Sequence, residues 1–419
     1  MKWKFWAAII ACAQLAFVGA RCLSTGTLHA QLSHLHSLVN LQFIFALLDL
    51  VVYPRLLLLR CKNHQLVNDL EKGTWIIFIG LTHLACLFFF VGLPDQHSWL
   101  AVLSFVCLGL YEHLAIFFII CKALEWLLDL ICPKTTNFVL KSKKLHTLIA
   151  VVLALGLTID GFITATSNPQ VSNIDISLPK GASNLDGFTI ALLTDVHIGP
   201  TVGKQRLQNI VNIVNGLDAD VIAIVGDLID GFLGNLGEKA LILKKLKSRH
   251  GTFFVTGNHE YYHSSIDEWI SFFKHKLNMT ILRNENFLIN QNICLAGVDD
   301  VVTQRLFIDG HRMDAEKAIQ NCPAKSYVVM MVHQPNAARK ILDMSSRHIN
   351  LILSGHTHGG QFYIFWPISY LYHAFLHGHY KYGKLGTDIV VSAGVNYWGP
   401  PAKMRNLCEI VRIKLVSNV

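Results

Sequence analysis

Side chains that bind metal ions recur along the second half of the sequence, each set directly after a short apolar run. In chain order they are Asp195-Val196-His197, Gly226-Asp227-Leu228-Ile229-Asp230, Gly257-Asn258-His259-Glu260, His333 and Gly355-His356-Thr357-His358-Gly359-Gly360-Gln361. Carboxylates, imidazoles and an amide supply the mixed oxygen and nitrogen ligands that suit Mn, Fe or Zn. Two such ions about 3.5 to 4 Å apart polarise a phosphoryl group and generate hydroxide at neutral pH. The pattern therefore predicts a dinuclear hydrolytic centre.

The ordered set is more specific than any of its members. Taken alone, Asp195 and His197 are explained by turn capping, and Gly-Asp after a strand is a common turn. The segment 355–361 is much more distinctive, because it places two histidines among glycines. Thiolate is absent from the set, which disfavours a structural zinc site.

The elements that must position these side chains are buried strands. The runs rich in Val, Ile and Leu are 188–193, 221–225, 252–255, 327–332 and 349–353. Continuous apolar runs of this length indicate strands buried on both faces. Segments with helical spacing lie between them, at 206–217, 238–247 and 314–321. Alternating strands and helices predict an α/β domain that binds its ligands beyond the carboxyl ends of the strands.

The ordered set resembles the calcineurin-like metallophosphoesterase superfamily, over roughly residues 186–415. The resemblance implies a four-layer α/β/β/α sandwich, in which two mixed sheets are flanked by helices. It also implies two divalent ions per chain, of Mn, Fe or Zn. The implied ligands of the first ion are Asp195, His197, Asp227 and His358. Those of the second ion are Asp227, Asn258, His333 and His356, with Asp227 as the bridge.

The resemblance implies further that a hydroxide shared by the ions attacks phosphorus in line with the leaving group. His259 would face the substrate and protonate the leaving oxygen, and Asp230 would orient it. For Glu260 we expect a supporting role behind the ligands. Protein phosphatases of the superfamily have Arg-Gly after the second Asp, whereas Gly231-Phe232 follows Asp230 here. This difference argues against a phosphoserine phosphatase.

Two other groups of residues resemble ligands but are not needed. Asp299 and Asp300 follow another apolar run, but the set above is already complete, so we expect them to serve as loop or cap residues. His377-Gly378-His379 is a conceivable chelate for a third ion, which we do not predict.

The first part of the chain predicts a multi-pass membrane region. A helix of roughly 20 apolar residues spans a bilayer core. Five runs approach this length, at 5–20, 38–59, 74–93, 99–120 and 145–165, although the first also reads as a cleaved signal peptide. We therefore divide the chain into a transmembrane region of about five helices at 1–166, a linker at 167–185 and a metallophosphoesterase domain at 186–419.

Charges in the loops predict the orientation of the chain. Two loops are basic and should be cytoplasmic; their charged residues are Arg60, Lys62, Lys72, Lys134, Lys141, Lys143 and Lys144. Five crossings then place the catalytic domain on the extracytoplasmic or lumenal side. The glycosylation tripeptide Asn278-Met279-Thr280 agrees with this orientation. Cys294, Cys322 and Cys408 are too scattered to predict a disulfide framework.

Four ionisable residues fall within the predicted spans, and an aromatic segment follows the last ligands. The four are Asp49, His83, Glu112 and His113, for which pairing between helices is favoured over transport. The segment 362–380 is rich in Phe, Tyr and Trp, so it either rests on the bilayer or covers the sheet. The first alternative would admit a lipid-linked or other membrane-borne phosphoester.

Together these features predict a membrane-anchored phosphoesterase that hydrolyses phosphomonoesters or phosphodiesters. The alternatives are a non-catalytic membrane scaffold that binds a phosphate ligand through the same fold, or a transporter with the domain as its regulator. The net charge of +8 is not concentrated in any dense basic stretch, so no nucleic-acid binding is indicated. The sequence leaves the oligomeric state and the physiological substrate open.

Overall fold

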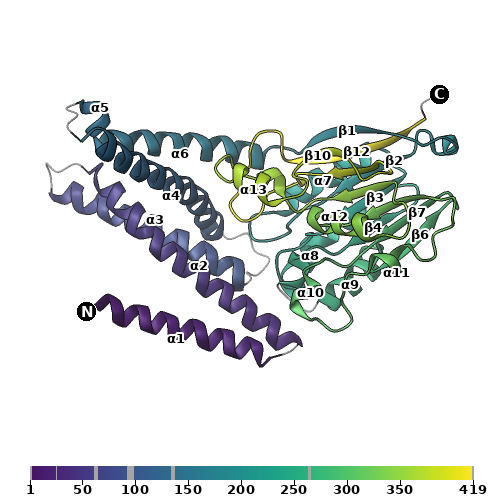
Figure 1. Cartoon of the computed structure of the whole chain (residues 1–419), viewed down its shortest axis with the longest axis horizontal. Helices are drawn as coiled ribbons and strands as arrows, with labels where there is room; N and C mark the ends of the chain where they lie inside the picture. Colours follow the sequence, from purple (N-terminus) through teal and green to yellow (C-terminus); the bar gives the residue numbers. More distant parts are fainter. Residues whose placement is uncertain are drawn as a thin grey trace.

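The fold places long helices at one end of the molecule and two sheets at the other (Figure 1). This computed structural model describes residues 2–24, 26–60, 65–91, 99–133, 137–262 and 266–417. The long helices are α1 Lys2–Cys22, α2 Gly26–Leu57, α3 Gln65–Val91, α4 Trp99–Ile131 and α6 Lys143–Thr166, and a short α5, Phe138–Lys141, precedes α6. Each predicted span overlaps one of the long helices.

Three described segments are long and apolar enough to cross a membrane: Leu35–Leu57 of α2, Gln65–Phe88 of α3, and the whole of α6. Small residues of α6, such as Ala150 and Ala154, pack inward, whereas larger ones such as Val152 and Ile159 are exposed. Apolar side chains turned outward are what lipid requires of a helix. The predicted spans at 5–20 and 99–120, within α1 and α4, stay predictions.

Asp49 and His83 inside the helical bundle pair between helices, as the sequence analysis favours, whereas Glu112 Oε2 is buried without a hydrogen-bond partner. The His83 Nε2 lies 3.0 Å from Asp49 Oδ2, and the Tyr111 hydroxyl donates to Asp49 Oδ1 at 2.7 Å. The guanidinium of Arg55 donates to both carboxylate oxygens of Glu125. Pairing of this kind lowers the cost of placing charge in an apolar bundle. It ties α2, α3 and α4 together.

Two six-stranded sheets make up the other end of the molecule, as far as the described residues show. In spatial order the first contains β1 Gln170–Ser177, β12 Glu409–Val416, β2 Thr189–Leu193, β3 Val221–Val225, β4 Thr252–Val255 and β5 Thr280–Ile281. The second contains β10 Gly378–Tyr382, β11 Thr387–Val391, β9 Leu351–Ser354, β8 Tyr327–Met331, β7 Ile293–Gly297 and β6 Glu285–Ile289. Both sheets mix parallel and antiparallel neighbours. The five predicted strands correspond to β2, β3, β4, β8 and β9.

Short helices connect the strands. They are α7 Lys204–Gly216, α8 Leu233–Ala240, α9 Ile266–His275, α10 Thr303–Leu306, α11 Ala315–Ile319, α12 Pro335–Met344 and α13 Trp366–Tyr372. Single 3-10 turns lie at Ser183–Leu185, Leu241–Lys245, His259–Tyr261 and His358–Gly360. The last two of these turns carry predicted site residues.

Apolar side chains on both faces of the central strands explain how the sheets are held. Alternate residues such as Leu192 and Val329 meet in a buried cluster between the two sheets. On the outer face of the first sheet, Ile222 packs with residues of α7, α8 and α9. On the outer face of the second sheet, Val328 packs with residues of α11 and α12. Burial on both faces fixes the strands and therefore the loops that follow them.

Two features differ from the sequence prediction. The predicted linker 167–185 contains β1, which pairs in parallel with β12 over its whole length. Its side chains are mostly polar, so the strand has no apolar run to reveal it. In addition, Cys294 and Cys322 form a disulfide, although they were predicted to be too scattered for one. The two cysteines meet because α11 packs against β7.

The helical bundle and the sheets are joined by direct contacts as well as by the chain. The Lys403 amide donates to the carbonyl oxygen of Gly161 in α6 at 3.0 Å, and Arg405 pairs with Asp160. A Cβ added to Gly161 would lie 3.0 Å from the Cβ of Ala402. The segment 400–405 therefore packs closely against α6.

Candidate metal centre

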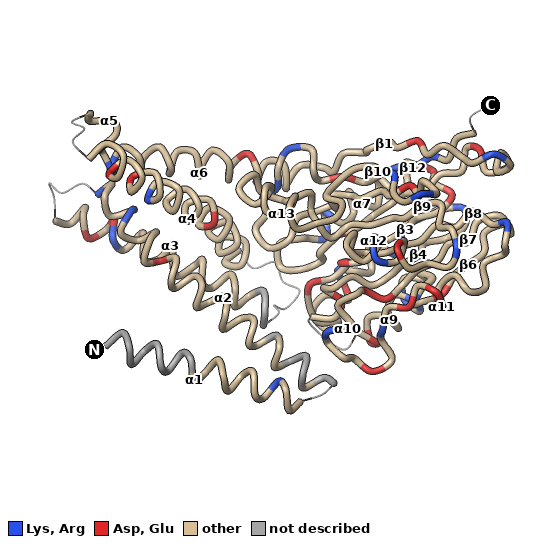
Figure 2. Tube along the Cα trace, in the orientation of Figure 1, with Lys and Arg blue, Asp and Glu red and all other residues tan. Residues whose placement is uncertain are grey.

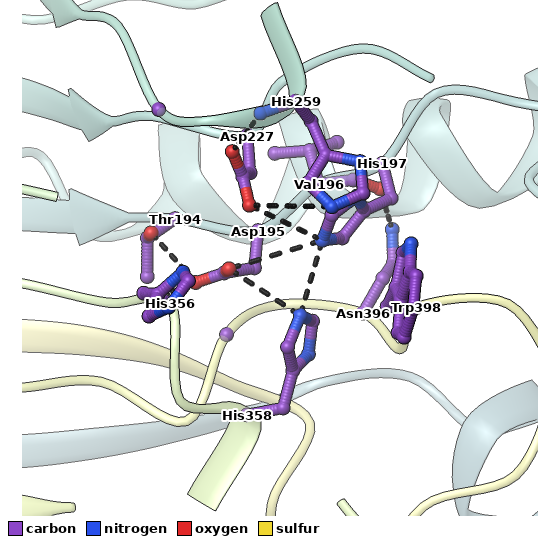
Figure 3. A network of polar contacts seen from close by, with 12 residues as sticks. Thr194, Asp195, Val196, His197, Asp227, His259, His356, His358, Asn396 and Trp398 are labelled. Atoms are coloured by element: carbon purple, nitrogen blue, oxygen red, sulfur yellow. Dashed lines mark hydrogen bonds and ion pairs between the residues drawn. The ribbon is translucent and has the colours of Figure 1, made fainter. Parts of the chain in front are cut away.

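The predicted site residues meet where the strands of both sheets end (Figure 3). Asp195 and His197 follow β2, and Asp227 follows β3. Asn258 follows β4, and the remaining ligands follow β8 and β9. Because β2, β3 and β4 run parallel to one another, as do β8 and β9, their carboxyl ends lie at common edges.

One group of potential ligands comprises Asp195, His197 and His358, whose candidate atoms lie within 4.8 Å of one another. The two imidazole Nε2 atoms are 3.1 Å apart. The Oδ1 of Asp195 lies 3.4 Å from His358 Nε2 and 3.8 Å from His197 Nε2. Three donor atoms converging on one point can hold a divalent ion.

A second group comprises Asp227, His333 and His356, which also lie within 4.8 Å. The Oδ2 of Asp227 is 3.0 Å from His333 Nε2 and 3.9 Å from His197 Nε2 in the first group. One carboxylate oxygen thus lies between the two groups, where a bridging ligand is needed. This arrangement matches the role that the resemblance implies for Asp227.

Hydrogen bonds leave the correct atoms of these side chains available to ions. The Asp195 Oδ2 accepts from the Thr194 hydroxyl and the His356 amide, whereas its Oδ1 is buried without a hydrogen-bond partner. The Nδ1 of His333 donates to a backbone carbonyl, which fixes the tautomer and leaves Nε2 with its lone pair. Asn258 Oδ1 is likewise buried without a partner. These atoms keep lone pairs that no hydrogen bond uses, so they are available to coordinate divalent cations.

The electrostatics of the site favour positive charge. Burial opposes protonation of His333, but the neighbouring Asp227 carboxylate outweighs it and raises the pKa of His333 to about 10. Burial also acts on Asp230, yet the imidazoles of His197 and His259 hold the pKa of its carboxyl well below the usual range. A metal ion satisfies the same carboxylates without a proton.

The backbone is strained at the ligands. Five non-glycine ligands adopt positive φ angles: Asp195 (55°), His197 (49°), Asp227 (52°), His356 (70°) and His358 (49°). Such conformations cost about 1 to 3 kcal/mol each and cluster at functional sites. The strain is therefore an independent sign of a site, because nothing in ordinary turn packing requires five such residues together.

Two glycines allow the loops to approach one another. A Cβ on Gly257 would collide with Oδ1 of Asp227, and a Cβ on Gly355 would collide with the Thr194 hydroxyl. Both glycines belong to the sequence motifs, and the motifs require them because a side chain would have no space. They bring the loop after β4 and the loop after β9 into contact with the first two ligand loops.

His259 lies beside the two ligand groups rather than within them. Its Nδ1 is 2.7 Å from Asp230 Oδ1, an atom that also lies 2.9 Å from His197 Nδ1. The ring of His259 packs edge-on against Tyr262 at 5.3 Å and against Trp398 at 5.7 Å. Asp230 therefore holds both imidazoles, and the two aromatic rings restrict the movement of His259.

Glu260 supports the loop that carries Asp227. Its side chain is fully buried and accepts hydrogen bonds from four backbone amides, those of Asp227, Leu228, Ile229 and Gly257. Burial and the charge of Asp227 raise the pKa of Glu260 to about 7, and the amides of Gly257 and Leu228 oppose that shift. The expected supporting role corresponds to these contacts.

The remaining candidates occupy other positions. Asp299 forms a two-point pair with Arg283, and Asp300 accepts from the Val302 amide and from Gln334. His377 pairs with Glu409, and His379 pairs with Asp388, so the two imidazoles have separate partners. None of these four is grouped with the ligands in the described part of the chain.

Sequence reasoning did not single out Tyr262, Trp398 or Lys403. Lys403 is fully buried, and its ammonium donates to the carbonyl oxygens of Ala393, Gly394 and Asn396. That segment wraps Asp195, since a Cβ on Gly394 would lie 2.7 Å from the Asp195 Cβ. The only signal for Trp398 was its place in the turn Tyr397-Trp398-Gly399-Pro400-Pro401.

The aromatic segment is divided between the two expected arrangements. Phe362 and Phe375 are buried against the protein. Trp366, Tyr370 and Tyr372 in and beside α13 are exposed, and α13 lies between the helical bundle and the sheets (Figure 1). Part of the segment therefore covers the core, and part is exposed.

Comparison with known proteins identifies the family of this chain. The model of the family described as "Calcineurin-like phosphoesterase" matches residues 188–360. A Caenorhabditis elegans protein whose name describes it as a metallophosphoesterase is 40% identical over 360 residues, which cover 84% of this chain and 74% of the relative. The proteins named "Transmembrane protein with metallophosphoesterase domain" from Danio rerio and Bos taurus are 34% and 33% identical. The alignments cover 81% and 83% of this chain, and 79% and 81% of those relatives. The chain belongs to the calcineurin-like phosphoesterase family, and it is similar to relatives whose names describe this domain in a transmembrane protein.

Proposed function

We propose that this protein is a membrane-anchored phosphoesterase that uses two divalent metal ions to hydrolyse a phosphomonoester or phosphodiester. The observation that carries the proposal is the position of Asp227 Oδ2 between two groups of unused donor atoms. The seven residues implied as ligands would hold the ions, which when bound supply Lewis acidity and a nucleophile at neutral pH.

The chain's own groups supply the rest of the chemistry. His259 is held by Asp230 through Nδ1, so its Nε2 is the atom that can give a proton to the leaving oxygen. Tyr262 and Trp398 pack edge-on against the ring of His259 and help to hold its orientation. Asp230 stabilises the protonated imidazole before transfer.

The first test is hydrolysis by the full chain purified in detergent with Mn²⁺ and assayed on p-nitrophenyl phosphate and its bis ester. We expect His259→Ala to lower kcat by about 10² to 10⁴ while metal content stays unchanged. His275→Ala is the matched control, because His275 is exposed at the end of α9. Equal rates for wild type and His259→Ala would remove His259 from the mechanism.

The same assay separates an enzyme from a scaffold. A wild-type protein that binds Mn²⁺ but hydrolyses no monoester, diester or phospholipid would favour the non-catalytic alternative. The pairing of Asp49 with His83 argues against the transporter alternative, and the buried, unpartnered Oε2 of Glu112 is the one feature of the described bundle that favours it.

We further propose that the catalytic domain lies on the extracytoplasmic or lumenal side. Three observations support this orientation. Lys and Arg gather around α5 and the nearby ends of the long helices, at the end of the bundle far from the sheets (Figure 2). The disulfide between Cys294 and Cys322 is typical of an oxidising compartment. Asn278 is exposed, so its glycosylation tripeptide is accessible.

Glycosylation tests this orientation. We expect the full chain expressed in eukaryotic cells to gain mobility on gels after treatment with peptide N-glycosidase, because Asn278-Met279-Thr280 is the one acceptor tripeptide in the sequence. Asn278→Gln should abolish the shift, whereas Asn212→Gln, a control outside any such tripeptide, should retain it. Cleavage of the catalytic domain by protease added to sealed microsomes would place the domain in the cytosol instead.

A further inference from the structure

A basic cavity opens beside the candidate metal centre. It has a volume of about 780 Å³, and His356 of the second ligand group lies in its wall. Arg305 of α10 and Arg339 and Lys340 of α12 line it as well. These three cations are not part of the ligand set, and the site chemistry described above uses none of them.

The positive charge in this cavity is only partly compensated. Asp343 is the one carboxylate in its wall, and its Oδ1 accepts a hydrogen bond from the Tyr382 hydroxyl at 3.1 Å. The guanidinium of Arg339 lies over the same Tyr382 ring at 6.0 Å, which orients it. Three cations against one carboxylate leave a net charge that favours an anionic ligand.

Tyr262 connects the cavity to the reacting side of the site. It lines the cavity, and its ring packs against His259. Because Arg305 lines the same cavity, this one side chain connects the ring of His259 with the basic wall. A ligand held by the cations would therefore continue into the space that His259 faces.

The other wall of the cavity is apolar and belongs to α13. Leu371 and Tyr372 are 84% and 68% exposed, and both line the cavity. Asn336 of α12 fixes this end of α13, because its side chain donates to the Tyr372 carbonyl oxygen and accepts from the Ala374 amide. The cavity thus has a basic wall and a fixed apolar rim.

The rim faces the membrane end of the molecule. In Figure 1, α13 lies beside the ends of α4 and α6. On another side of the cavity, α10, which carries Arg305, contacts α2. A ligand with both an apolar chain and a charged head could enter from the bilayer without leaving contact with the protein.

We propose that this cavity binds a second phosphoryl group of an amphiphilic substrate, with Arg305, Arg339 and Lys340 holding that group and Leu371 and Tyr372 contacting the apolar chain. The inference rests on the proposed function, since it names the substrate class of the same site. Guanidinium groups suit phosphoryl oxygens, because they donate two parallel hydrogen bonds. The cavity thereby selects lipid phosphates with an additional phosphoryl group over those with one.

The test begins with binding, measured by calorimetry on the full chain in detergent with Mn²⁺. The probes are methylenediphosphonate, which carries two phosphonate groups, and methylphosphonate, which carries one. We expect the wild type to bind the first more tightly, and the triple variant R305Q/R339Q/K340Q to lose about tenfold or more of that preference. The matched control K180Q/K384Q/K414Q removes the same charge from exposed positions elsewhere and should keep the preference.

A second arm distinguishes a lipid from a soluble ligand. Mixed micelles carrying phosphatidylinositol 4-phosphate or phosphatidylinositol would compete with the bound diphosphonate. We expect the 4-phosphate lipid to compete better, and L371S/Y372S to weaken that competition while leaving diphosphonate affinity unchanged. If L371S/Y372S leaves lipid competition unchanged, the apolar part of the proposal is wrong, and if neither lipid competes with the wild type, the ligand is soluble.

Binding tests the basic cavity and hydrolysis tests the proposed function, so the two can fail independently. A triple variant that keeps the full diphosphonate preference would show that the preference comes from chelation by the ions, and it would overturn the basic cavity as a binding site. Hydrolysis of p-nitrophenyl phosphate by that same variant would leave the proposed function intact. A wild type without any hydrolytic activity would instead contradict the proposed function, whatever the binding results.

Discussion

Replacing Asp227 with Asn should reduce the metal content of the purified protein from two divalent ions per chain to at most one, and should reduce turnover in parallel. Its Oδ2 lies between the two ligand groups, 3.0 Å from His333 Nε2 and 3.9 Å from His197 Nε2. Its Oδ1 accepts from the His259 amide at 2.9 Å, so the carboxylate is fixed. An amide keeps the shape but removes the one negative charge that both ions would share.

The expected size of the effect follows from the burial of Asp227, which is 1% exposed. Removing one partner of a buried charge pair costs about 3 to 5 kcal/mol, or roughly 10² to 10⁴ in affinity. Elemental analysis of the protein after gel filtration in Mn²⁺ or Zn²⁺ measures this directly. Circular dichroism should show that the variant is folded.

Asp300→Asn is the matched control for this prediction. Asp300 is also a buried carboxylate near His333, and burial raises its pKa to about 6. Its Oδ1 accepts from the Val302 amide and from Gln334, and its Oδ2 is buried without a hydrogen-bond partner, but the described ligand groups do not include it. The variant should keep both ions. An equal loss of metal from Asp300→Asn would show that the ligand set is incorrect.

The sequence predicted those site residues that directly follow a recognisable strand in the chain. Each ligand cluster directly follows its own strand, and runs such as 221–225 are apolar enough to be recognised alone. Parallel strands then bring Asp195, Asp227 and Asn258 to one edge without further information. The family resemblance supplied the division into two ligand groups, which spacing alone leaves open.

The part that escaped prediction depends on contacts between distant segments. β1 is a polar strand, and it is held by β12, whose residues lie more than two hundred positions later. The sequence suggests a surface position for Lys403, but its ammonium is surrounded by carbonyl groups of residues 393–396, a segment that bonds to the distant loop after β2. Trp398 and Tyr262 approach His259 from two different loops.

Glu260→Gln should lower the melting temperature of the protein by on the order of 10 °C, although it exchanges one oxygen for a nitrogen of similar size. Both carboxylate oxygens of Glu260 already accept two backbone amides each. An amide nitrogen in either position cannot accept, so two buried N–H groups lose their partner. Each such loss costs about 1 to 3 kcal/mol, against a total stability of about 5 to 15 kcal/mol.

The loss should also appear in metal binding, because three of the four amides belong to Asp227 and the two residues after it. A loosened loop holds the bridging carboxylate less well, and supporting groups of this kind change metal affinity by about 10 to 100-fold. Glu268→Gln is the control, since Glu268 is exposed in the first turn of α9. Thermal unfolding followed with and without Mn²⁺ separates the two effects, because Mn²⁺ should raise the melting temperature of Glu260→Gln less than that of the wild type. Equal stabilisation by Mn²⁺ in both proteins would show that Glu260 holds the fold but not the metal loop.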